Sequence, residues 1–211
     1  MHTSPSSFAL LLAAADCANG CQPALLDEAD RARLAHSPAL AQRPDWQVSR
    51  FLKQQTALPV LSLSHSHGTA LLAAADSPFS AGVDIEALKT RDFKTLSAYS
   101  CSPEEQKWLA ERGWQAADFY RLWTLKEALI KAAMLDFPAD LPHVGITVAR
   151  GRLKIKHSAG RAWQGLSALT RTHALACVWE ADAHIQTEWR FFGKLAAQET
   201  VLQAVWRLEA V

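Results

Sequence analysis

The stretch "FSAGVDIEAL", residues 79–88, places two carboxylates, Asp84 and Glu86, in a run of small and β-branched residues. In a strand alternate side chains share a face, so Asp84 and Glu86 point the same way while Val83 and Ile85 point into the opposite layer. Like charges on one face repel each other. A hard cation between them removes the repulsion, because Mg²⁺ binds carboxylate oxygens and adds phosphate oxygens and waters. The alternative is an exposed strand end with two solvated acids.

Composition limits the classes of protein to which the chain can belong. Its 211 residues, 49% of them hydrophobic, suffice for one sizeable domain or two small ones with a substantial core. Lys and Arg number 22 against 21 Asp and Glu, so no overall field favours nucleic acid or a membrane surface. The four cysteines show no C-x-x-C spacing and are too few for a disulfide scaffold, which favours a reducing cytoplasm.

Strands are expected in four further parts of the chain. The apolar stretch "FALLLAAADCA" lacks the basic segment of a secretory signal and is too short to span a bilayer, so we interpret it as a buried strand. "LPVLSLSHSHGTALLAAADSP" predicts two strands around the turn "SHSHG", and "GITVARGRLKIKH" predicts a hairpin about its "RG" turn. "HALACVWEA" is a further strand, and "DSPFSAG" is the best internal break.

Helices are expected between these strands and at the end of the chain. "LLDEADRARLA" predicts a short helix, and "DWQVSRFLKQQ" a second one with Asp45 as N-cap. In "SPEEQKWLAE", Ser102, Pro103 and Glu105 predict a capping box. A longer helix runs through "AADFYRLWTLKEALIKAAML" and is ended by Pro138, and the tail "GKLAAQETVLQAVWRL" has helical spacing. Helices and hairpins without regular βαβ alternation predict an α+β fold.

The long helix supplies a third acid. Trp123, Glu127 and Lys131 are spaced by four residues and lie along one face. An ordinary surface ion pair between Glu127 and Lys131 would be worth only a few tenths of a kcal/mol. Apolar neighbours leave little of the helix circumference for solvent, which favours a functional site over that interpretation.

A second polar cluster lies in "LSLSHSHG", where His65 and His67 stand beside Ser64 and Ser66. A histidine in a turn is usually simple polar surface. Here the imidazole, the hydroxyls and nearby backbone N–H groups could together donate hydrogen bonds to a phosphate.

Three segments, taken together and in this order, resemble the motifs of a known family: "LSHS" at residues 63–66, "GVDIE" at 82–86 and "WTLKEALIKA" at 123–132. The family is that of the 4′-phosphopantetheinyl transferases of the larger, surfactin-synthetase-activating type. The resemblance implies two similar α+β halves in one chain, with the active site in the cleft between them. Residues 1–77 would contact the nucleotide end of coenzyme A and carry the "SHS" motif, and residues 78–211 would carry the metal site.

The same resemblance implies an activity. A cytoplasmic monomer would transfer the 4′-phosphopantetheine group of coenzyme A to a serine of an apo acyl or peptidyl carrier protein, with Mg²⁺ or Mn²⁺, and release 3′,5′-ADP. Neither nucleic acid nor a membrane is an expected partner.

Roles for single residues follow only from the resemblance. The metal ligands would be Asp84, Glu86 and Glu127, and the catalytic residues Glu127, Glu105, Lys131 and His65. Residues expected to bind coenzyme A are Ser64, His65, Lys126 and Lys131, together with the N-terminal bases Arg33, Arg43, Arg50 and Lys53. The chain departs from the family at one place. Many members have a "GKP"-like stretch before "SHS", whereas this chain reads "FLKQQTALPVLSLSHS" there.

Two other functions stay open. A carrier-binding module of the same fold without catalysis would not need the intact charged residues, and a Mg²⁺-dependent phosphohydrolase would use the same acids on another pyrophosphate.

Overall fold

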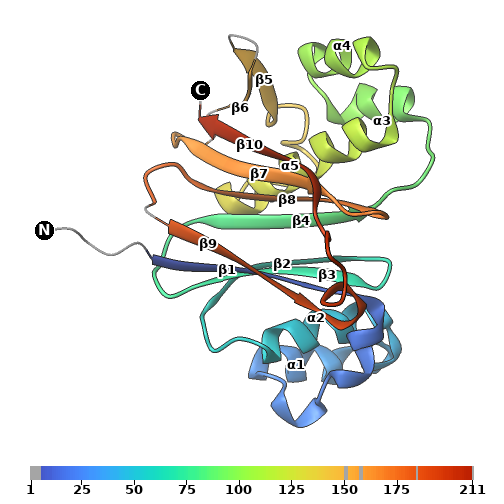
Figure 1. The fold of residues 1–211 in the computed structure, drawn as a ribbon, viewed down its shortest axis with the longest axis vertical. Helices are drawn as coiled ribbons and strands as arrows, with labels where there is room; N and C mark the ends of the chain where they lie inside the picture. Colours follow the sequence, from blue (N-terminus) through green and yellow to red (C-terminus); the bar gives the residue numbers. More distant parts are fainter. Residues whose placement is uncertain (1–5, 150–151, 157–158, 184, 211) are drawn as a thin grey trace, which may run out of the picture. The chain divides into compact units, whose positions relative to one another are not determined.

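The computed structural model describes residues 6–149, 152–156, 159–183 and 185–210. Two compact units make up the chain. The first consists of Met1–Ser77 and Ile185–Glu199, and the second of Pro78–His184 and Thr200–Val211. Each unit contains a sheet and helices (Figure 1), which confirms the expected α+β class.

The first unit is built on a sheet of strand order β2-β3-β1-β9. Its strands are β1 (Ser6–Ala13), β2 (Val60–Ser66), β3 (Thr69–Ala75) and β9 (Ile185–Phe192). The predicted first strand and the hairpin around "SHSHG" are confirmed as β1 and as β2 with β3. β1 runs antiparallel to β3 and parallel to β9.

Helices cover one face of this sheet. They are α1 (Glu28–His36) and α2 (Pro44–Gln54), with short 3₁₀ turns η1 (Ala15–Gly20), η2 (Pro23–Leu25), η3 (Pro38–Gln42) and η4 (Gly193–Leu195). The apolar side of α2 packs on the sheet, where Val48 and Leu52 join Leu11 and Leu72 in one core. The expected N-cap of α2 is wrong: Arg43 holds that position, and the Asp45 carboxylate accepts a hydrogen bond from the backbone of Gly68 instead.

β9 departs from the sequence-based division at residue 77. That division assigned every residue after 77 to the second half, but β9 pairs along its whole length with β1, from Ser6 opposite Ile185 to Ala13 opposite Phe192. Residues 185–199 therefore belong to the first unit.

The second unit is built on a sheet of order β4-β8-β7-β10-β6-β5. Its strands are β4 (Ala81–Ala87), β5 (Ile146–Ala149), β6 (Arg152–Ile155), β7 (Trp163–Leu169), β8 (His173–Glu180) and β10 (Gln203–Ala210). Its helices are α3 (Phe93–Ser100), α4 (Pro103–Glu111) and α5 (Ala116–Ala133). The predicted capping box of α4 is confirmed, and so are the strands at "GVDIE" and "HALACVWEA". β5 and β6 pair as the predicted hairpin, whose "RG" turn, residues 150–151, lies outside the described residues.

The long helix α5 lies across β4, β8 and β7 (Figure 1). Most of its side chains are buried, as its apolar circumference predicts. The helix ends at Ala133, where Met134 takes a left-handed conformation with φ 52°, so it stops before Pro138 is reached.

The predicted C-terminal helix is wrong. After the short turn η4, the chain forms β10, which runs antiparallel to β7 and parallel to β6. Val201 and Leu208 are buried there. Sheet pairing and this burial outweigh a helical spacing that has no tertiary partner, because local propensity is only a weak preference.

The described helices were also compared with the requirements for crossing a membrane. None of them is both long enough and apolar enough to do so.

Candidate functional site

The three acids that the sequence singled out meet in the second unit. Asp84 and Glu86 come from β4 and Glu127 from α5. One carboxylate oxygen of each lies within 4.8 Å of those of the other two. Asp84 is almost fully buried, with 1% of its surface exposed, and the other two acids are half-buried. Residues 43 positions apart in the chain thus form one acidic group, called the acidic triad below.

Close packing between β4 and α5 creates the triad. A Cβ atom on Gly82 would lie 2.0 Å from the carbonyl oxygen of Ala128 and 2.7 Å from the backbone nitrogen of Ala132. Only a residue without a side chain lets the strand approach the helix backbone this closely. The glycine of "GVDIE" therefore sets the distance between the acids of the strand and the acid of the helix.

Lys131 contacts the triad directly. Its Nζ lies 2.7 Å from Asp84 Oδ1, 3.8 Å from Glu127 Oε2 and 3.2 Å from the carbonyl oxygen of Val83. The side chain is 34% exposed, so the ammonium lies at the border between the triad and solvent. The helical pair of Glu127 and Lys131 is thus part of a larger charged group that includes a buried strand residue.

Burial, together with the nearby charge of Asp84, raises the pKa of Glu127 to about 7. The positive charge of Lys131 lowers it, the charge of Glu86 raises it, and a hydrogen bond from the Trp123 side chain lowers it. Desolvation and like charges destabilise the ionised carboxylate in this position. A bound cation would offset both effects.

The donor set fits a hard divalent cation. The three ligands offer only carboxylate oxygens, and all three can reach a common point because their oxygens lie within 4.8 Å of one another. Oxygen ligands from one or more carboxylates, completed by phosphate oxygens and waters, are what Mg²⁺ prefers in proteins. The residues present therefore suit Mg²⁺ or Mn²⁺.

Two other predicted site residues, Glu105 and Lys126, meet elsewhere. Their side chains are 1% and 0% exposed and form an ion pair of 2.7 Å. Lys126 Nζ also donates to the carbonyl oxygens of Ser100 and Leu141, at 2.7 and 2.6 Å. An ammonium has three N–H donors, so these contacts leave none for a phosphate.

Glu105 is equally occupied. Its carboxylate accepts hydrogen bonds from the backbone of Ser102, which closes the capping box, and from the backbone of Ile146. A Cβ on Gly145 would lie 1.7 Å from Glu105 Oε1, and Gly145 itself has φ 149°. Through these contacts Glu105 and Lys126 join α4, α5 and the chain before β5, and their catalytic and cofactor-binding roles stay predictions.

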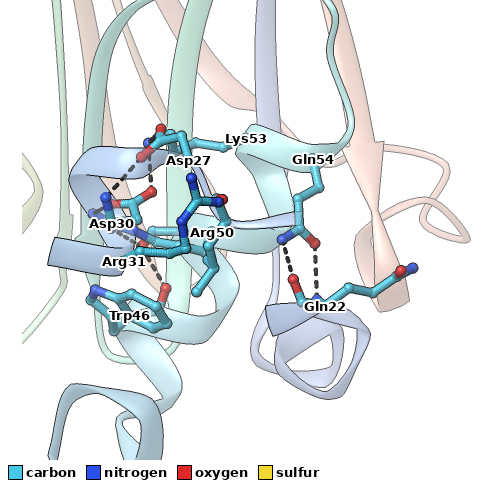
Figure 2. A network of polar contacts seen from close by, with 10 residues as sticks. Gln22, Asp27, Asp30, Arg31, Trp46, Arg50, Lys53 and Gln54 are labelled. Atoms are coloured by element: carbon cyan, nitrogen blue, oxygen red, sulfur yellow. Dashed lines mark hydrogen bonds and ion pairs between the residues drawn. The ribbon is translucent and has the colours of Figure 1, made fainter. Parts of the chain in front are cut away.

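Two of the four N-terminal bases, Arg50 and Lys53, form ion pairs with acidic side chains (Figure 2). Arg50 pairs with Asp30 at 2.7 Å, with side chains 6% and 3% exposed. Lys53 lies between Asp27 and Asp30 and contacts both. The hydrogen bond from Lys53 is the main reason why the pKa of Asp27 is lowered. Much of the positive charge of this pair is therefore balanced within the unit.

The other N-terminal candidates lie at the surface or in β2. Arg33 is in the last turn of α1, Arg43 caps α2, and both are exposed. Ser64 and His65 lie in β2 and are half-buried. Burial lowers the pKa of His65; the charge of Asp45 raises it, and those of Arg50 and Arg43 lower it. His65 is therefore disposed to be neutral near pH 7, with one ring N–H as donor.

A pocket of about 340 Å³ in the second unit was not predicted from the sequence. Its lining consists of Glu86, Arg91, Leu96, Phe119, Tyr120 and Trp123. Phe119 and Trp123 stack with their ring centroids 5.9 Å apart. The signal that could have located it is the four-residue spacing of Phe119, Trp123 and Glu127, which continues the face of α5 past the triad.

Residues 80–178, which contain the acidic triad, match the 4′-phosphopantetheinyl transferase superfamily. No curated protein matches the chain.

Proposed function

Because residues 80–178 match the 4′-phosphopantetheinyl transferase superfamily, we propose that this protein transfers 4′-phosphopantetheine from coenzyme A to a serine of an apo acyl or peptidyl carrier protein. The superfamily supports a phosphopantetheine transferase in general. The carrier substrate, the dependence on Mg²⁺ and membership of the larger, surfactin-synthetase-activating type are parts of our proposal.

Asp84, Glu86 and Glu127 would hold the metal. The bound cation would neutralise pyrophosphate oxygens of coenzyme A and so make the phosphorus more electrophilic. The support for this assignment is the donor set of three carboxylates within 4.8 Å of one another.

Glu127 is the glutamate that we assign to proton transfer. A bound cation would offset the burial and like charge that raise the pKa of Glu127, so its carboxylate would be ionised near neutral pH and able to accept a proton. Glu105, the other candidate, is occupied by the backbone of Ser102, the backbone of Ile146 and Lys126. The serine hydroxyl would give its proton to Glu127 while its oxygen forms a bond to the phosphorus that carries pantetheine. The bond to the 3′,5′-ADP oxygen would break.

Lys131 and His65 would bind phosphate oxygens. Lys131 supplies an ammonium next to the triad, and His65 a neutral imidazole from β2. Arg33 and Arg43 replace Arg50 and Lys53 as our first candidates for the 3′-phosphate of coenzyme A, because their side chains are exposed whereas Arg50 and Lys53 are paired with acids.

The observation that carries the proposal is the acidic triad inside the superfamily domain. The test is mass spectrometry of several apo carrier proteins after incubation with this protein, coenzyme A and Mg²⁺. We expect one carrier to gain the mass of a single phosphopantetheine. The gain should disappear when a chelator is added, and also when the Asp84→Asn variant replaces the wild type.

Other results would favour another function. Carrier binding without a mass gain would indicate a non-catalytic module. Release of 3′,5′-ADP and 4′-phosphopantetheine from coenzyme A without any carrier would indicate a hydrolase. Either result, obtained with carriers that a reference transferase modifies, would contradict the proposed transfer.

A further inference from the structure

The position of the Lys131 ammonium carries an inference about how the site binds its ligands. Nζ lies 2.7 Å from Asp84 Oδ1 and 3.8 Å from Glu127 Oε2, so it already serves as a cation for two members of the triad. The family resemblance led us to expect this lysine on phosphate. In the structure it contacts Asp84 and Glu127, two of the residues expected to hold the metal.

A divalent cation and this ammonium would both neutralise the carboxylates of Asp84 and Glu127. Asp84, Glu86 and Glu127 would hold such a cation through their carboxylate oxygens. The ammonium, at 2.7 Å from Asp84 Oδ1, would then be a close neighbour of the same charge sign. Lys131 must therefore leave Asp84, or weaken the binding of the cation.

The structure allows Lys131 to leave. Its backbone is fixed because α5 is packed against β4 at Gly82, but its side chain is 34% exposed and has a flexible four-carbon stem. Asp84, by contrast, is 1% exposed and lies on a strand. The lysine head can move, and the acid stays in place.

We propose that Lys131 is an exchangeable counter-ion of the acidic triad. It neutralises Asp84 and Glu127, leaves Asp84 when a divalent cation is held there, and then binds the phosphate that accompanies the cation. The inference rests on the metal site of the proposed function and adds a coupling: cation binding releases the positive charge that recognises the anion.

A lysine that exchanges and a lysine that stays on Asp84 predict different changes in cation affinity when Lys131 is removed. If Lys131 stays on Asp84, removing it strengthens cation binding to a similar extent with and without the anion. If Lys131 moves to phosphate, its removal strengthens binding of the cation alone and weakens binding of the cation together with the anion.

The experiment measures Mn²⁺ affinity, by calorimetry or by the electron paramagnetic resonance of free Mn²⁺, with and without saturating coenzyme A. The variants are wild type, Lys131→Met and the control Lys107→Met. Lys107 also faces a glutamate four residues away on a helix, Glu111, but it is 79% exposed and remote in sequence from the triad. We expect Lys131→Met to bind Mn²⁺ alone at least about tenfold more tightly than wild type and to bind it at least about tenfold more weakly with coenzyme A, as expected for losing one charge-assisted contact. Lys107→Met should equal wild type in both.

Each other outcome contradicts a stated part of the argument. A similar gain in affinity with and without coenzyme A, or no change in either, overturns the exchange and leaves the metal site intact. Failure of wild type to bind Mn²⁺ overturns the metal site and the exchange with it. If Lys131→Met does not fold, Lys131→Gln, which keeps a hydrogen-bond donor for Asp84 without the charge, is expected to show the same reversal of sign.

Discussion

Lys126 and Glu127 are neighbours in the chain but belong to different parts of the second unit. Lys126 points into the interior, where its ammonium meets Glu105 and two carbonyl oxygens. Glu127 points to the acidic triad. Adjacent helical residues differ by about 100° around the helix axis, so one motif supplies one charge to the interior and another to the acidic triad.

The first prediction concerns Lys126. Replacing it by methionine keeps most of the side-chain volume but leaves the buried Glu105 carboxylate without its counter-ion. Breaking a buried ion pair in this way costs about 3–5 kcal/mol. We expect Lys126→Met to lower the free energy of unfolding, measured in denaturant, by that amount.

A surface lysine provides the comparison for Lys126. Lys107→Met removes an ion pair whose side chains are 79% and 64% exposed and should change stability by less than about 0.5 kcal/mol. If Lys126→Met unfolds like wild type but loses coenzyme A binding, the lysine acts on substrate and our assignment is wrong.

The second prediction uses the pKa of Glu127. Its pKa rises from 4.5 to about 7 on folding, so the folded protein binds this proton more tightly than the unfolded chain does. The stability that results is fully present below pH 4.5 and is lost as the pH rises through about 7. A shift of this direction and size is worth on the order of 1–3 kcal/mol.

Glu127→Gln removes this titration, so its melting temperature relative to wild type should increase between pH 5 and pH 8. The measurement is thermal unfolding in the presence of a chelator. Glu111→Gln, a change at an exposed glutamate, should follow wild type at every pH. If the melting temperatures of Glu127→Gln and wild type change in parallel with pH, the surroundings of Glu127 do not destabilise its ionised carboxylate.

At the scale of elements, the decisive contact is that of β4 with α5. The third prediction is that Gly82→Ala separates the two, because the added Cβ meets the backbone of Ala128 at 2.0 Å and backbone atoms have little room to move. Overpacking of this kind costs about 1–3 kcal/mol. The shift should also move Glu127 away from Asp84, so we expect weaker Mn²⁺ binding together with lower stability in denaturant.

Two comparisons test this reasoning. Gly20→Ala would bring a Cβ to 3.0 Å from the ring of Phe51, a side chain that can rotate, so its cost should be smaller. Adding Ala128→Gly to Gly82→Ala should not restore stability, because the clash is with the carbonyl oxygen and not with the alanine methyl group. Full recovery would show that the contact is misidentified.

Elements with strong local signals were predictable from the sequence. The capping box of α4 and the strand with Asp84 and Glu86 are examples, because a few neighbouring residues specify each of them. β10 was not predictable, because its conformation depends on β7 and β6, which are distant in sequence.

The same distinction holds for the site. Periodicity indicated that Asp84 and Glu86 share a strand face and that Glu127 lies on a mostly apolar helix, and the family resemblance joined the three as metal ligands. The environments of Lys126 and Arg50 could not be predicted, since a lysine or arginine in a helix has the same local sequence pattern whether its partner is a phosphate or a buried carboxylate. The acids that engage them, Glu105 and Asp30, lie 21 and 20 residues away in the chain.

At the scale of the whole chain, the segment that matches the superfamily is shorter than the unit that contains it. Residues 80–178 include β4 and β7 but lack β10, which completes the sheet of the second unit. β10 also satisfies the buried Arg121 of α5, whose guanidinium donates to the carbonyl oxygen of Ala204 and lies 4.0 Å from the centre of the Trp206 ring. Burial lowers the pKa of this arginine to about 10, so it remains charged and needs these partners.

The last prediction is that removing Thr200–Val211 destabilises the second unit even though the superfamily match is kept whole. The deletion exposes the core residues that Val201 and Leu208 cover, worth about 1.5–3 kcal/mol each, and leaves Arg121 with Ser167 as its hydrogen-bond partner. Together these losses approach the roughly 5–15 kcal/mol that stabilise a typical domain. Hydrogen exchange should therefore show lost protection in α5 and β7, and the loss should be much larger than for Glu209→Ala, which removes a 69%-exposed ion-pair partner from the same strand. A truncated protein that keeps native protection in α5 would mean that residues 78–184 form a complete fold without β10, and that Arg121 is satisfied in another way.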